Sequence, residues 1–223
     1  MIHRSADAFQ ECGRCILKLL EAKPRSTMAI SGGSSPKPMF EMFAKAEFDW
    51  SRVDLFWADE RGVPPDNEQS NFKLANDLWL GPAGFPKANI HRMRGELPAE
   101  AAARLYTDEI RDVLKLAPGV MPEFDVIHLG LGPDSHTASL FPGEPMIDDR
   151  RGLAAAVWVE RFQQWRITLL PGVLLAAKHI AVLVTGRDKD AALRTVLEGA
   201  YDPKLHPAQL LLSALDVEWF VSD

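Results

Sequence analysis

Short apolar runs that end in glycine or polar residues, each followed by a helical pattern, constrain this chain more than any other feature. The runs are dense in valine, isoleucine and leucine, as expected for strands that are covered on both faces of a sheet. Strands that alternate with helices favour a mainly parallel sheet. The sequence therefore predicts an α/β fold of the Rossmann-like, doubly wound kind, with helices on both faces. Strands are expected at 27–31, 53–58, 89–92, 124–129, 154–160, 166–170, 179–185 and 217–221, and helices at 8–20, 36–46, 70–80, 98–116, 173–177 and 188–197.

Composition narrows the class of protein. The 223 residues hold no repeat or low-complexity tract, so we expect a single domain over residues 1–223. Lys and Arg number 25 against 31 Asp and Glu, and this net charge of −6 argues against nucleic acid or an anionic membrane as partner. The N-terminal residues lack a signal-peptide pattern, and no apolar run approaches the ~18 residues of a membrane span. We expect a cytoplasmic monomer or small homo-oligomer.

The two cysteines, Cys12 and Cys15, form a C-x-x-C arrangement inside an expected helix. Such a pair can be a redox centre or half of a zinc site, but no second pair accompanies it. We therefore expect both to be structural, with no disulfide framework, no metal and no cofactor. Structural roles are likewise expected for His3, His91, His128, His179 and His206.

Ligands of open α/β sheets bind beyond the carboxyl ends of the strands, so the loops there are where chemistry is expected. The first such loop, residues 31–36, contains Gly32, Gly33 and Ser34. Its glycines allow close backbone approach, and the start of the next helix offers free N–H groups to an anion. The Gly-Lys-Ser/Thr ending of a nucleotide-binding P-loop is missing. The loop is either an anion-binding segment or a flexible turn.

The second loop, residues 59–62, carries two carboxylates and a guanidinium. Asp59 and Glu60 could orient a polyol, and Arg61 could hold a phosphate. The alternative for these three residues is a solvated surface charge cluster.

The third loop, residues 130–137, follows a buried strand and contains Asp134 and His136. It lacks the third glycine of a dinucleotide-binding fingerprint, because Ser135 stands there. An imidazole titrates near neutrality and can take a proton from water, while a nearby carboxylate can orient the ring. His136 is thus a candidate general base and Asp134 its partner.

The fourth loop, residues 185–189, places Lys189 in the first turn of a helix, where a cation opposes the helix dipole unless an anion is bound. Arg166, at the start of another strand, is a further candidate cation. An acidic protein that gathers Arg61, Arg166 and Lys189 near His136 is expected to bind a small anionic substrate such as a sugar phosphate.

These segments resemble the glucosamine-6-phosphate isomerase/6-phosphogluconolactonase family over nearly the whole chain. The matching segments are residues 31–36, 57–61, 70–71, 130–142, 166–169 and 185–189. Members of the lactonase branch have Asp-Glu-Arg in the second loop, as at residues 59–61, where isomerases have Asp-Glu-Tyr. Isomerases also carry a proton-transferring Glu after the shared His, and Phe141 occupies that position here.

The chain departs from the family pattern at two places. Ser135 replaces the usual glycine of Asp-Gly-His, at a position where a left-handed backbone suits glycine better. An Asn that many lactonases carry after the strand at 166–170 is missing.

The resemblance implies hydrolysis of 6-phospho-D-glucono-1,5-lactone, without metal or cofactor, as the second step of the oxidative pentose phosphate pathway. It implies His136 as general base, Asp134 as its orienting partner, Gly33 and Ser34 as donors near the reacting end, and Asn71 as a binding residue. Arg61, Lys189 and Arg166 would hold the phosphate. The alternatives are an amino-sugar phosphate isomerase/deaminase and a non-catalytic sugar-phosphate-sensing module.

Overall fold

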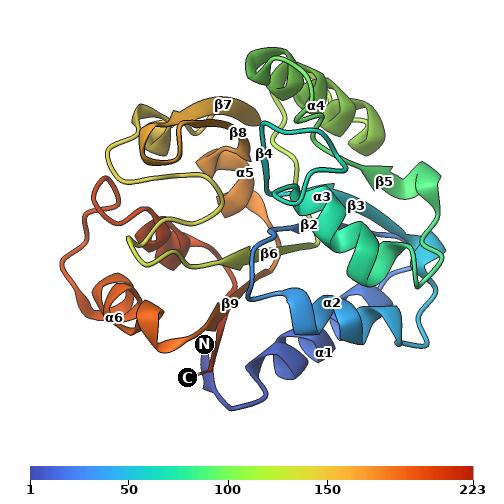
Figure 1. Cartoon of the computed structure of the whole chain (residues 1–223), viewed down its shortest axis with the longest axis horizontal. Coiled ribbons are helices and arrows are strands. Elements are labelled where there is room, and N and C mark those ends of the chain that lie inside the picture. The colour runs from blue at the N-terminus through green and yellow to red at the C-terminus, as the bar shows by residue number, and fades with distance from the viewer. Residues whose placement is uncertain (223) are drawn as a thin grey trace.

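The computed structural model describes residues 1–222, and its centre is a sheet of seven parallel strands in the order β1-β10-β9-β6-β2-β3-β5 (Figure 1). Strand order reverses between β6 and β2, where two halves of the sheet meet. The strands are β1 (Ile2–Arg4), β2 (Ser26–Ile30), β3 (Val53–Trp57), β5 (Ile90–His91), β6 (Val126–Gly130), β9 (Ile180–Thr185) and β10 (Val217–Ser222).

Helices cover both faces of this sheet, so the doubly wound α/β fold expected from the sequence is confirmed. Figure 1 shows α1 and α2 on one side of the sheet and α4 and α5 on the other. The helices are α1 (Ala8–Glu21), α2 (Lys37–Ala44), α3 (Asn71–Ala75, continued by a π-helical turn at Asn76–Leu80), α4 (Ala99–Leu114), α5 (Pro171–Ala176) and α6 (Asp190–Glu198).

A second, antiparallel sheet has the order β4-β8-β7, with β4 (Asp59–Arg61), β7 (Ala154–Val159) and β8 (Gln164–Leu169). The segment 59–62, expected to be a loop, is therefore largely a strand. Three charged residues give no strand signal, and β4 forms because β8 offers it hydrogen-bonding partners, with Arg61 opposite Arg166. This pairing carries the end of β3 directly into the second sheet.

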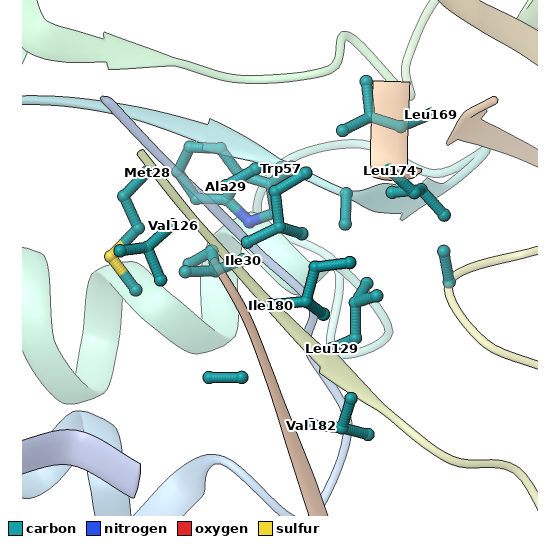
Figure 2. Packing of buried hydrophobic residues seen from close by; sticks show 14 of the residues in the cluster. Met28, Ala29, Ile30, Trp57, Val126, Leu129, Leu169, Leu174, Ile180 and Val182 are labelled. Carbon is teal, nitrogen blue, oxygen red and sulfur yellow. The ribbon is translucent and has the colours of Figure 1, made fainter. Parts of the chain in front are cut away.

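Apolar side chains on β2, β3, β6 and β9 form the centre of the core. Figure 2 shows Ile30, Trp57, Leu129 and Val182 packed with neighbours from β8 and α5. On α1, the buried residues recur every four positions, at Ala8, Cys12, Ile16 and Leu20, so one stripe of the helix faces the sheet. A fully buried side chain as large as Ile16 or Leu20 contributes about 1.5–3 kcal/mol to stability by leaving water.

None of the helices within residues 1–222 combines the length and apolar character needed to cross a membrane.

Candidate active site

Loops at the carboxyl ends of four parallel strands, β2, β3, β6 and β9, surround one cavity of about 240 Å³. The strands β4 and β8 and the turn after β7 close its side. Of the residues expected from the sequence, those that line it are Gly32, Gly33, Ser34, Asp59, Arg61, Asn71, His136, Arg166 and Lys189. Asp134 contacts the cavity through His136, and Glu60 lies outside its lining.

The glycines after β2 have different tasks. Gly33 has φ = 97°, a backbone conformation that favours glycine, and a Cβ there would meet no atom within 4 Å because the residue borders the cavity. At Gly32 a Cβ would lie 2.1 Å from Asn71 Oδ1, so only glycine lets α3 approach this loop. The backbone of this loop is thus exposed to whatever fills the cavity.

The loop after β6 is bent into the shape that presents His136. Ser135 is buried with φ = 67°, the left-handed conformation anticipated for this position, which costs about 1–2 kcal/mol for a residue with a Cβ. The Gly132 and Ser135 amides donate to His136 O (2.8 Å) and Gly132 O (3.0 Å), respectively. A Cβ on Gly132 would lie 1.9 Å from His136 Nδ1, so the imidazole rests directly on the glycine backbone.

His136 and Asp134 form a hydrogen-bonded pair through Nδ1 and Oδ1. Burial raises the pKa of Asp134, but its hydrogen bond and charge interaction with His136, aided by Arg161, outweigh burial and hold that pKa well below its usual range. The ionised carboxylate can only accept, so Nδ1 carries the hydrogen and Nε2 presents its lone pair. This is the arrangement of a general base with an orienting carboxylate.

Arg161 holds the other oxygen of Asp134, with Nη1 2.6 Å from Oδ2. Its guanidinium lies 4.7 Å from the ring centre of Phe141 and 4.6 Å from that of Phe162. The Phe141 ring in turn lies 4.4 Å from the His136 ring. Arg161 and the Phe141 ring therefore hold both members of the pair in place.

The cavity concentrates positive charge. Arg166 is only 9% exposed, and burial together with the neighbouring Arg61 guanidinium lowers its pKa to about 10. Within residues 1–222, the Nε atoms of both arginines are buried without a hydrogen-bond partner. Lys189 lines the same cavity and pairs with Asp188 at 2.8 Å. Arg166 is buried, whereas Arg61 is partly buried and donates through Nη1 to Gln69 O. Guanidinium groups that keep free donors beside a cavity are suited to an anionic ligand.

Asp59 and Asn71 form a polar part of the cavity lining, and Asn71 lies directly against Gly32. Asp59 is buried and accepts from Ser139 Oγ at 2.8 Å, and its backbone oxygen accepts from Asn71 Nδ2 at 2.9 Å. Asn71 Oδ1 is buried with no partner in the described chain. The amide oxygen is thus available to a hydroxyl group in the cavity.

Glu60, expected to orient substrate, performs a structural task instead. It is 2% exposed, and its carboxylate accepts from the backbone N–H groups of Arg61 (2.7 Å), Asn71 (2.7 Å) and Phe72 (2.8 Å) and from Ser70 Oγ (3.0 Å). Burial raises the pKa of Glu60 even though these bonds lower it. The carboxylate ties the start of α3 to β4, and its acceptor capacity faces protein rather than the cavity.

Sequence reasoning missed two residues of the site, Arg161 and Phe162. They lie in the turn between β7 and β8, at a sequence that resembles a polar surface turn. Their place depends on pairing between two strands of the second sheet, and nothing local in the sequence signals it.

Comparisons with known proteins identify the family of this chain. The family model described as glucosamine-6-phosphate isomerases/6-phosphogluconolactonase matches residues 3–219. A 6-phosphogluconolactonase from Synechocystis sp. is 33% identical over 207 residues, 92% of this chain and 85% of that protein. One from Treponema pallidum is 38% identical over 179 residues, 79% of this chain and 73% of that protein. The crystal structure of 6-phosphogluconolactonase from Thermotoga maritima has a TM-score of 0.86 at 29% identity, covering 100% of this chain and 99% of that one. The chain belongs to the glucosamine-6-phosphate isomerase/6-phosphogluconolactonase family.

Proposed function

We propose that this chain hydrolyses 6-phospho-D-glucono-1,5-lactone to 6-phospho-D-gluconate, as the relatives named above are lactonases. The observation that carries the proposal is the meeting of the His136–Asp134 pair with the underpaired Arg61 and Arg166 in one cavity. The pair suits attack by water on an ester carbonyl, and the cations suit a phosphate.

His136 Nε2 removes a proton from a water molecule, whose oxygen attacks C1 of the lactone. As the bond between C1 and the ring oxygen breaks, the same nitrogen returns the proton to that oxygen, so atoms and charge balance. Asp134 holds the ring and stabilises its protonated form. The exposed backbone beside Gly33 and the hydroxyl of Ser34 can donate to oxygens at the reacting end.

Arg166, Arg61 and Lys189 hold the phosphate, and Asp59 and Asn71 contact the hydroxyl groups of the substrate.

The two free cysteines suit a reducing compartment, so we place the enzyme in the cytoplasm. We further propose that the chain forms one domain and works as a monomer or small homo-oligomer.

The family also contains isomerases, and Phe141 favours the lactonase over them. Its ring borders the cavity 4.4 Å from the His136 ring, in the position where resemblance would place the isomerase Glu. A phenyl group carries no exchangeable proton, so ring opening of an amino-sugar phosphate lacks its proton-transfer group here.

Turnover of freshly generated lactone near pH 7, compared with its spontaneous hydrolysis, tests the proposal. We expect strong acceleration, with no ammonia released from glucosamine-6-phosphate assayed in parallel. Ammonia release would favour the isomerase. Stoichiometric binding of sugar phosphate without turnover of either compound would favour the sensing module.

Replacing Arg161 with alanine is expected to lower kcat about fivefold and leave KM within about twofold. The ion pair with Asp134 is partly exposed, which limits its value to about 1 kcal/mol, or about fivefold in rate. Arg161→Lys should restore part of the loss, and Arg151→Ala, at an exposed position, serves as control. A rise in KM at constant kcat would mean that Arg161 contacts substrate rather than positioning the pair.

A further inference from the structure

Three potential metal ligands meet at the amino ends of the parallel strands, on the side of the sheet opposite the cavity. Cys15 comes from α1, His179 directly precedes β9, and Glu218 is near the start of β10. Figure 1 shows α1 beside β9. The Cys15 Sγ lies 3.9 Å from His179 Nε2 and 3.7 Å from Glu218 Oε1, and the last two atoms are 3.6 Å apart.

These separations are close to the edges of a zinc tetrahedron. With Zn–S of about 2.3 Å and Zn–N or Zn–O of about 2.0–2.1 Å, tetrahedral geometry puts ligand atoms about 3.3–3.6 Å apart. Shifts of a few tenths of an ångström would bring the three atoms to those distances. Cys15 is partly exposed, and the Glu218 side chain is 22% exposed, so an ion can reach them from solvent.

A second layer of contacts holds two of the ligands in place. Asp216 Oδ2 accepts from His179 Nδ1 at 2.8 Å, which turns the lone pair of Nε2 toward Cys15 and Glu218. His3 Nε2 binds Glu218 Oε2, and its ring stacks on Phe220 at 4.9 Å. Carboxylate–histidine contacts of this kind accompany metal-bound histidines in proteins.

We propose that Cys15, His179 and Glu218 bind a zinc ion that fastens α1 to β9 and β10. A thiolate, a carboxylate and a neutral imidazole together carry two negative charges, which balance the charge of Zn²⁺. Sulfur, nitrogen and oxygen donors in one set favour zinc over magnesium or calcium. Water fills the fourth position. Because the cluster lies at the amino ends of the strands, the ion is remote from the cavity.

The sequence could not disclose this site. Its only recognisable signal is the C-x-x-C pair, yet Cys12 is fully buried in the core and is not one of the three ligands. Residues 164 and 203 positions away supply the remaining ligands, and only the pairing of β9 with β10 brings them together.

Titration of the chelator-treated protein with Zn²⁺ and with Co²⁺ tests the proposal. We expect one equivalent of metal per chain, and a sulfur-to-cobalt charge-transfer band in the near ultraviolet. Zinc at about 100 times its Kd should raise Tm by about 5–10 °C. Lactone turnover should be the same with and without zinc, which keeps this result separable from that of the proposed function.

Cys15→Ser should abolish the charge-transfer band and the rise in Tm, whereas Cys12→Ala should keep both. Asp216→Asn, which alters only the contact with His179, should weaken binding about 10–100-fold. Glu218→Gln provides a second ligand variant if Cys15→Ser folds poorly. Metal binding without the band, or a band and Tm rise that persist in Cys15→Ser, would overturn the site.

Discussion

Replacing His136 with alanine is expected to lower kcat by about 10²–10⁴-fold, with KM changed little. General-base assistance is worth that factor, and the cations, the polyol contacts and the backbone donors remain in the variant. The ring is partly exposed and rests on Gly132, so its removal leaves the fold intact. Lactone consumption, corrected for spontaneous hydrolysis, provides the measurement, and circular dichroism checks the fold.

Asp134→Asn is the matched variant for this prediction. It keeps a side chain of the same shape beside His136 Nδ1 but removes the charge that stabilises the protonated ring. Its kcat should fall between those of the wild type and His136→Ala. A His136→Ala enzyme with kcat near that of the wild type would show that another group activates the water.

Replacing Glu60 with alanine is expected to lower the free energy of unfolding by about 3–5 kcal/mol. The change leaves buried donors at Arg61, Asn71 and Phe72 without an acceptor, and each such loss costs about 1–3 kcal/mol, partly relieved by relaxation. For a chain of this length, that corresponds to about 6–20 °C in Tm. Thermal or urea unfolding measures the effect.

Glu60→Gln separates this structural task from a substrate contact. The amide of the variant keeps one oxygen that can accept hydrogen bonds, but its NH₂ group faces backbone donors that the second carboxylate oxygen used to satisfy. The loss of stability is therefore expected to be smaller than in Glu60→Ala. Kinetic constants measured well below Tm should stay within a few-fold of the wild type. A KM raised more than tenfold at unchanged Tm would return Glu60 to the substrate-binding residues.

Most of the fold follows from patterns that lie within short segments. Residues of β2, β3, β6 and β9 form apolar runs, so their alternation with helices can be read directly. The strands β1 and β4 were missed, because each has three residues and owes its existence to a distant partner, β10 for one and β8 for the other. Pairing over such distances leaves no local periodicity.

In the candidate site, too, contacts between residues close in sequence could be predicted, and contacts that depend on strand pairing could not. Asp134 and His136 are two positions apart, so their contact could be expected from the loop alone. The Arg61–Arg166 neighbourhood depends on strand register. Charge by itself also misleads, since Asp59 and Glu60 look alike in sequence, yet one borders the cavity and the other binds the start of α3.

The position of β10 between β1 and β9 has a consequence for the order in which the chain can fold during synthesis. Strand β1 is made first but pairs in the sheet with β10 alone, more than 200 residues later. While the ribosome elongates the chain, β2, β3 and β6 can assemble, whereas β1 and the apolar flank of β9 stay uncovered. We expect chaperones that bind nascent chains to protect this region until β10 emerges, and the sheet to close from its centre toward β1.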